Sequence, residues 1–119
     1  YTIIPFSLGT AVPGTKSWNW YGQVPEAPSN VSVTNPTATS LRVNFTDNTY
    51  DETNILIERK TGASGNWVSL GGFGILNKTG NWYWNNTGLV SKTTYCYRLK
   101  AVNAVGSSPY SNEACGTTL

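Results

Sequence analysis

Apolar and polar residues alternate in several short stretches of the chain. In the clearest one, residues 95–101 (YCYRLKA), Tyr, Leu or Ala occupies every second position. A period of two is typical of a β-strand with one buried face, because successive side chains point to opposite sides of the strand. The pattern therefore predicts a strand over residues 93–102.

The same alternation, bounded by Gly, Pro, Asn and Ser, predicts six further strands. They contain, in chain order, Val31 and Val33; Leu41, Val43 and Phe45; Ile55 and Ile57; Trp67, Val68 and Leu70; Trp82, Tyr83 and Trp84; and residues 110–118. Gly71, Gly72 and Gly74 are expected to prevent extension of the fourth strand. The loop 103–109 predicts a hairpin with Gly106 available for a positive φ.

The region from Leu89 to Ser111 resembles the last two strands of a fibronectin type III domain. Leu89, followed six residues later by Tyr95, looks like a tyrosine corner, in which a buried Tyr hydroxyl needs a backbone partner nearby. The resemblance is completed by Asn103, Gly106, Ser108, Tyr110 and Ser111, and it covers about residues 28–118. It implies an all-β fold: a seven-stranded antiparallel Greek-key β-sandwich of the immunoglobulin-like kind.

Two departures from the family pattern affect this prediction. The family usually has Trp where Phe45 stands, which implies a smaller residue at the centre of the core. Some members bind cell receptors through an RGD loop between the last two strands, whereas the corresponding loop here reads NAVGSS. Integrin-type adhesion through that motif is therefore not expected.

Residues 1–27 precede the domain at 28–119 and have no counterpart in the family. Four apolar residues in this extension would share one face of an extended segment: Ile4, Phe6, Leu8 and Val12. Pro5 and Gly9 argue against a central strand and favour a sheet edge or a docked tail. Further along, Trp18, Trp20 and Tyr21 are expected either to pack on the domain or to contact a partner.

Length and composition limit the classes of function. The 119 residues are enough for one core, and with 12% charged residues and a net charge of +2 the chain offers no basic surface for nucleic acid. Ser, Thr and Asn together supply 40 of the 119 residues, a neutral coat typical of extracellular proteins. No apolar stretch approaches the ~20 residues of a membrane span. Because the sequence begins at Tyr1, we expect a processed chain or an excised fragment.

Catalytic and metal-binding chemistry is poorly provided for. The chain has no His, so the plentiful Ser residues lack the usual base, and Glu26 and Glu58 have no evident carboxylate partner. One loop contains four residues with possible calcium ligands, Asp47, Asn48, Asp51 and Glu52, but their spacing does not match an EF-hand. A solvated acidic turn is the expected alternative. We therefore expect a non-enzymatic protein without metal or cofactor.

Two Cys residues, Cys96 and Cys115, are predicted to form a disulfide. If the last two strands pair Ala101 with Tyr110, the same register places Cys96 opposite Cys115. Cys96 is out of phase with Tyr95, so the bridge is expected on the outer face of the sheet. The alternative is a pair of free thiols.

Two kinds of surface feature remain. Four Asn-X-Ser/Thr sequons make glycosylation candidates of Asn30, Asn44, Asn77 and Asn85. Seven aromatic residues could form a platform for stacking sugars or could instead cover the domain and anchor the extension: Trp18, Trp20, Tyr21, Trp67, Trp82, Tyr83 and Trp84.

The sequence supports two hypotheses of function. In the first, the protein is a structural subunit of a surface filament or adhesive assembly, and residues 1–12 self-associate by adding a strand to the sheet edge of a neighbour. The alternative is a spacer or a carbohydrate- or protein-binding module of a larger secreted protein, such as a polysaccharide-degrading enzyme. The position of residues 1–21, on their own domain or on another chain, distinguishes self-packing from assembly.

Overall fold

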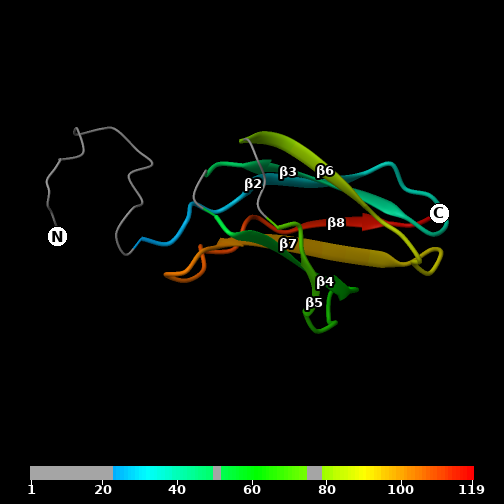
Figure 1. Ribbon diagram of the computed structural model, residues 1–119. Coiled ribbons are helices and arrows are strands. Elements are labelled where there is room, and N and C mark those ends of the chain that lie inside the picture. Colours follow the sequence, from blue (N-terminus) through cyan, green and yellow to red (C-terminus); the bar gives the residue numbers. More distant parts are fainter. Residues whose placement is uncertain (1–22, 50–51, 75–78) are drawn as a thin grey trace, which may run out of the picture.

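The computed structural model describes residues 23–49, 52–74 and 79–119, which form seven β-strands and no helix (Figure 1). The strands are β2 (Ser29–Thr34), β3 (Leu41–Asp47), β4 (Asn54–Thr61), β5 (Val68–Gly72), β6 (Gly80–Asn86), β7 (Thr94–Val102) and β8 (Ala114–Thr117). One sheet has the order β2-β3-β6 and the other β5-β4-β7-β8, and every pairing is antiparallel. The predicted seven-stranded β-sandwich is confirmed.

Alternation along the strands builds the core between the two sheets. On β3 every second residue is buried, and the inward residues of β4 and β7 pack against them. Phe45 sits in this core with only 3% of its surface exposed, and its ring stacks on Phe73 at a centroid distance of 5.5 Å. Phe73 in turn meets the edge of Trp84 at 5.6 Å. Phe45 thus belongs to a cluster of three aromatic rings at this point of the core.

A polar bridge links the two sheets inside the sandwich. Asn86 Oδ1 accepts hydrogen bonds from the Tyr97 hydroxyl at 2.6 Å and from Arg59 Nη1 at 3.0 Å. Tyr97 is fully buried, and this burial raises its pKa to about 12. Because the three residues belong to β6, β7 and β4, the bridge fixes how the two sheets face each other.

The turn into β7 is closed by a side chain. The backbone N–H of Val90 donates to the Tyr95 hydroxyl at 2.9 Å, and Leu89 beside it is buried. A Tyr hydroxyl bonded to the backbone a few residues upstream is the geometry of a tyrosine corner.

The last hairpin differs from the predicted register. Cys96 lies opposite Cys115 as expected, but Ala101 lies opposite Ser108 and not Tyr110, since the Ser108 N–H donates to the Ala101 carbonyl at 2.7 Å. The predicted strand 110–118 is therefore wrong at its start, and β8 begins only at Ala114. Pro109 lacks the N–H that continuous pairing of two strands needs. The hydroxyls of Ser108 and Ser111 instead accept hydrogen bonds from the N–H groups of Ala101 and Leu99.

Two glycine predictions also change. Gly106 does not have a positive φ; the turn is held by Asn103 Oδ1, which accepts from the N–H groups of Val105 and Gly106. The fourth strand starts one residue late, at Val68, and continues through Gly71 and Gly72. Gly71 has a φ of +102° at the point where the register with β4 shifts, so its lack of a side chain permits a bulge inside the strand.

Candidate binding faces

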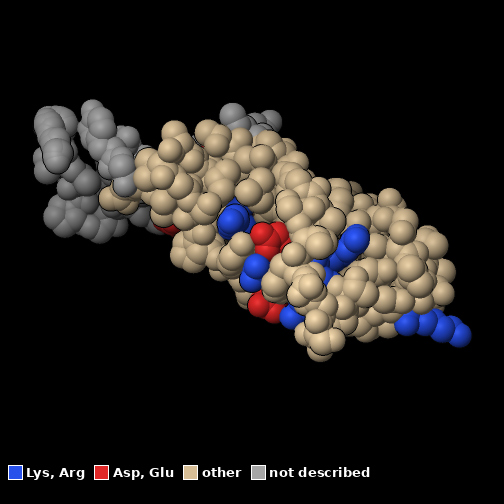
Figure 2. Space-filling view, turned by 90° about the horizontal axis from the view of Figure 1, so that it is seen from below, with Lys and Arg blue, Asp and Glu red and all other residues tan. Residues whose placement is uncertain are grey.

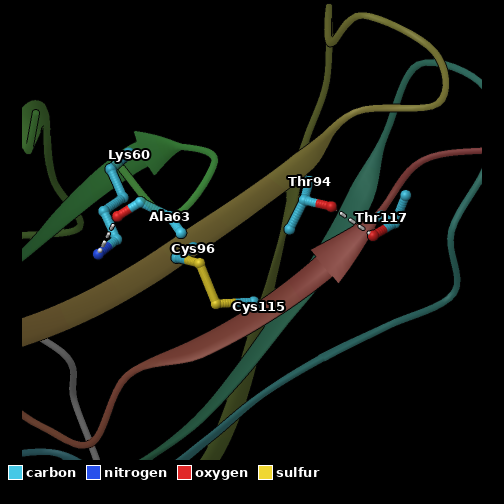
Figure 3. Close-up of a disulfide and its surroundings, with 6 residues drawn as sticks. All are labelled: Lys60, Ala63, Thr94, Cys96, Cys115 and Thr117. Atoms are coloured by element: carbon cyan, nitrogen blue, oxygen red, sulfur yellow. Dashed lines mark hydrogen bonds between the residues drawn. A yellow bond between two sulfur atoms is a disulfide. The ribbon is translucent and has the colours of Figure 1, made fainter. Parts of the chain in front are cut away.

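The disulfide lies on the outer face of the four-stranded sheet (Figure 3). Cys96 and Cys115 are joined by an S–S bond of 2.01 Å between directly opposed positions of β7 and β8. Cys115 is exposed, but only 4% of Cys96 is accessible, and Figure 3 shows the bridge near Lys60, at the end of β4, and Ala63, in the turn that follows. The bridge closes a loop that contains the whole last hairpin.

The acidic loop is not a solvated turn, contrary to expectation. Asp47 and Glu52 are 1% and 3% exposed and share a hydrogen bond, while Asp47 Oδ1 accepts from the Thr49 N–H at 3.2 Å. Burial raises the pKa of Asp47, and the hydrogen bonds from Thr49 and Glu52 oppose this rise. Asn48 Nδ2 donates to the Ala27 carbonyl at 2.9 Å. The loop therefore anchors the chain where it enters the domain.

Metal binding finds no support in the described part of the chain. The residues that the structure describes contain no group of three or more His, Cys, Asp or Glu side chains that could hold an ion. Asp51 of the acidic loop lies outside the described residues. In the same described part, no helix is long and apolar enough to cross a membrane.

The outer face of the four-stranded sheet carries a ladder of alternating cations and aromatic rings. The Arg98 guanidinium carbon lies 4.2 Å from the centre of the Trp67 ring and 3.8 Å from that of Tyr110. Lys60 approaches Trp67 at 5.0 Å, and Lys100 approaches Tyr110 at 4.9 Å. Figure 2 shows the charged side chains gathered along this face. We call these five residues the cation–aromatic ladder.

Glu58 binds both Arg98 and Tyr110 at the centre of the ladder. Its Oε1 accepts from Arg98 Nε at 2.9 Å and pairs with Nη2 at 2.8 Å, and its Oε2 accepts from the Tyr110 hydroxyl at 3.0 Å. Partial burial alone would raise the pKa of Glu58, but the bonds from Arg98 and Tyr110 and the charges of Arg98 and Lys100 hold the pKa below its ordinary value. Glu58 thus pairs with the central cation, Arg98. Lys60 and Lys100 lie over the two rings and form no ion pair with a carboxylate of the described residues.

The outer face of the three-stranded sheet is open and almost uncharged. A groove of about 330 Å³ lies on it, lined by Asn30, Asn44, Phe45, Thr46, Asn81, Trp82 and Tyr83. Tyr83 exposes 60% of its surface. Asn44 is paired with Tyr83 and Thr46 with Asn81, so the side chains of these β3 and β6 residues lie together on one face of the sheet. We call this site the Tyr83 groove.

Hydrogen bonds organise the polar side chains of the Tyr83 groove. The Thr46 hydroxyl donates to Asn81 Oδ1 at 2.9 Å and accepts from Asn30 Nδ2 at 3.4 Å. Asn44 Nδ2 donates to the hydroxyls of Ser32 and Thr34 at 3.2 and 3.0 Å. These bonds hold the amides in defined orientations before any ligand arrives.

One charged residue borders the groove. Arg42 Cζ lies 4.2 Å from the centre of the Tyr83 ring, and its Nε donates to Asn85 Oδ1 at 3.1 Å. Arg42 therefore stacks on one face of the Tyr83 ring, and Asn85 on β6 holds the guanidinium in place.

Of the seven aromatic residues for which a sugar platform or a cover of the domain was expected, four lie in the described residues, and the structure separates them. Trp82 and Trp84 pack against the core, Trp67 belongs to the ladder, and Tyr83 alone among these four is exposed. The other three, Trp18, Trp20 and Tyr21, lie outside the described residues together with the predicted interaction residues Ile4, Phe6, Leu8 and Val12. Arg42, Thr46 and Asn81 were missed, although their alternation with buried residues on β3 and β6 was a usable signal.

The sequons fall in different settings. Asn30 and Asn85 are exposed, Asn44 is half-buried with its amide nitrogen engaged, and Asn77 lies outside the described residues. Asn30 adopts a φ of 54° at the point where the pairing of β2 with β3 is irregular. Glycosylation at these positions stays a prediction.

Comparison with known proteins gives the family. The family model of the fibronectin type III domain matches residues 26–117, and the chain belongs to that family. Members are typically non-catalytic modules within larger proteins, used as spacers or interaction domains. A search of the curated proteins finds no match.

Solved structures show the same fold at low identity. Titin domains A168–A170 match with 23% identity and a TM-score of 0.63 over 80% of this chain, which spans 32% of that titin chain. The protein FN3tt matches with 24% identity and a TM-score of 0.62, covering 81% of this chain and 96% of the other. An Fn3-like protein from Clostridium thermocellum has 19% identity and a TM-score of 0.60, covering 78% and 92%.

Proposed function

We propose that this protein is a non-enzymatic, extracellular interaction module that recognises its partner through the outer face of the three-stranded sheet. The observation that carries the proposal is the Tyr83 groove, where an exposed ring lies among ordered, uncharged hydrogen-bonding groups. On the opposite face the described rings are more engaged, because Arg98 stacks on both Trp67 and Tyr110 and is paired with Glu58. The disulfide between Cys96 and Cys115 supports an oxidising compartment.

The proposal is tested by binding of the disulfide-intact protein to immobilised polysaccharides and secreted proteins from its source. Tyr83→Ala is expected to weaken the binding at least tenfold, whereas Tyr110→Ala, a matched Tyr removal on the opposite face, leaves it unchanged. Binding that survives Tyr83→Ala but is lost with Tyr110→Ala would place the recognition surface on the ladder and reject the proposal.

A spacer role is the second candidate, favoured by where the described chain enters and leaves. The segment before β2, drawn in blue, lies at one end of the sandwich, and the C-terminal end of the chain lies at the other (Figure 1). Domains joined through such ends extend a chain in line. If small-angle scattering of a tandem of two copies gave a folded-back pair instead of an elongated one, this arrangement would be excluded.

Self-assembly through residues 1–12 remains a further proposal. Its support in the described part of the chain is β6, which pairs with β3 on one side and is the last strand of its sheet. Strand addition to such an edge would form main-chain hydrogen bonds with a neighbour. Sedimentation of the full chain and of a variant lacking residues 1–12 tests it: concentration-dependent assembly should disappear with the deletion, and a monomer in both cases argues against it.

A further inference from the structure

The exposed ring of Tyr83 is held ready for stacking. Arg42 lies over one face of the ring at 4.2 Å from its centre, and 60% of the Tyr83 surface stays accessible. The electron-rich face of an aromatic ring attracts groups that carry partial positive charge, and the C–H bonds on one side of a pyranose ring are such groups. A ring that is already fixed loses little conformational entropy when a ligand stacks on it.

The amides around the ring keep hydrogen-bonding capacity. Within the described residues, the hydrogen bonds of Asn44 use its Nδ2 and that of Asn81 uses its Oδ1, so the Asn44 Oδ1 acceptor and the Asn81 Nδ2 donor remain. Adjacent hydroxyls of a sugar offer both a donor and an acceptor. The groove therefore presents the complementary pair on the two strands that flank its floor.

The charge of the lining selects the class of sugar. None of the seven lining residues is ionisable near neutral pH, and the guanidinium of Arg42 is committed to Tyr83 and Asn85. A carboxylated or sulfated ligand would find only this one cation, at the border of the groove, and neutral groups in the whole lining, so a neutral sugar loses less hydration on binding. The volume of 330 Å³ falls at the lower end of the ~300–1,000 Å³ usual for small-molecule sites, which suits a few sugar rings of a longer chain.

We propose that the Tyr83 groove binds the pyranose units of a neutral polysaccharide, with Tyr83 as stacking platform and Asn44 and Asn81 as hydrogen-bonding groups. This inference rests on the proposed function, in which the same face is the recognition surface. The ladder, although richer in rings, is less open to a sugar: Arg98 stacks on both Trp67 and Tyr110, Trp67 is half-buried, and Tyr110 exposes 39% of its surface against 60% for Tyr83.

The experiment is an NMR titration of the disulfide-intact full chain with neutral hexasaccharides of glucose, mannose and xylose, and with oligogalacturonate as the anionic control. Production in a bacterial host leaves Asn30 and Asn44 without attached glycans. At least one neutral hexasaccharide is expected to shift backbone amides of β3 and β6, and oligogalacturonate to shift none. Tyr83→Ala should weaken binding at least tenfold, Asn81→Ala about threefold or more, and Tyr110→Ala not at all, with near-UV circular dichroism confirming that each variant folds.

Several outcomes overturn the inference. These are no shift with any neutral hexasaccharide at millimolar concentration, shifts confined to the other sheet, preference for oligogalacturonate, or undiminished binding by Tyr83→Ala. If the sugars fail while Tyr83→Ala still abolishes binding to an immobilised secreted protein, the proposed function stands and the carbohydrate inference alone falls. If neither a sugar nor a protein responds to Tyr83→Ala, both fall.

Discussion

The two outer faces of the sandwich use aromatic residues in opposite ways. On the four-stranded sheet, Trp67 and Tyr110 enclose Arg98, and Glu58 closes the cluster from within. On the three-stranded sheet, Tyr83 is held by a single Arg42 and stands beside a groove of neutral amides. The difference teaches that an exposed aromatic residue is a better indicator of a binding face where the neighbouring polar groups keep hydrogen-bonding capacity than where stacked cations and an ion pair engage the ring.

The largest expected effect tests the stabilising role of the four-stranded face. Replacing both Cys96 and Cys115 by Ala should lower the free energy of unfolding by about 3 kcal/mol, because the bridge closes a loop of moderate length. Urea unfolding of both proteins measures the change. Affinity for the ligand of the Tyr83 groove should stay the same; a loss of affinity in the folded variant would show that the two faces are coupled.

Matched ring removals give the next largest contrast. Trp67→Ala should cost about 1–2 kcal/mol of unfolding free energy, since it uncovers one face of Arg98, and should leave binding intact. Tyr83→Ala should change stability by only about 0.5 kcal/mol, because its ring is largely exposed. Thermal or urea denaturation checks both. The comparison fails if Tyr83→Ala is the more destabilising of the two.

The pH dependence of the ladder follows from Glu58. Its pKa is lowered in the folded state, so its contribution to stability is present above the unfolded pKa and is lost as the pH falls through the folded pKa. Glu58→Gln should therefore destabilise by about 1 kcal/mol at neutral pH and by less below pH ~4. Urea midpoints between pH 7 and pH 3 measure this. A constant difference across that range would mean that the charge of Glu58 does not stabilise the ladder.

The smallest effect concerns how Tyr83 is held. Arg42→Ala removes the cation above the ring and the bond to Asn85, and should weaken ligand binding about two- to threefold through lost ordering of Tyr83. Arg42→Lys keeps the charge and should restore part of the affinity. Isothermal titration calorimetry distinguishes lost ordering of Tyr83 from loss of a direct contact between Arg42 and the ligand, because lost ordering appears as a larger entropic cost of binding. An unchanged affinity and entropy would show that Tyr83 needs no such support.

Much of the fold was predictable because period-two alternation is a local property. Strands β3 and β7 bury the very residues that the pattern assigned inward, and the pairing of Cys96 with Cys115 followed from counting along a hairpin. The same counting placed Ala101 opposite Tyr110 and was wrong there. The register shifts at Pro109, where two serine hydroxyls replace backbone carbonyls as hydrogen-bond acceptors. Such a replacement does not alter the alternation of apolar and polar residues, so the sequence pattern does not reveal it.

The candidate site was less predictable for a different reason. The sequence does not distinguish the roles of the seven aromatic residues, yet the described ones belong to three different places: the core, the cation–aromatic ladder and the Tyr83 groove. The burial of Asp47 and Glu52 was likewise missed, because a loop of acidic residues looks solvated until packing places it against the entering chain.

The sequence by itself determined the alternation of strands and turns, the family and the cysteine pairing, since each depends on neighbours in the chain or along one hairpin. Only the tertiary structure decided which aromatic rings are covered by neighbouring side chains and which stay exposed. That distinction depends on residues far apart in sequence: Trp67 with Arg98 and Tyr110 on one face, and Arg42 with Tyr83 on the other. Their meeting is set by the order of strands in two sheets, which no local pattern encodes.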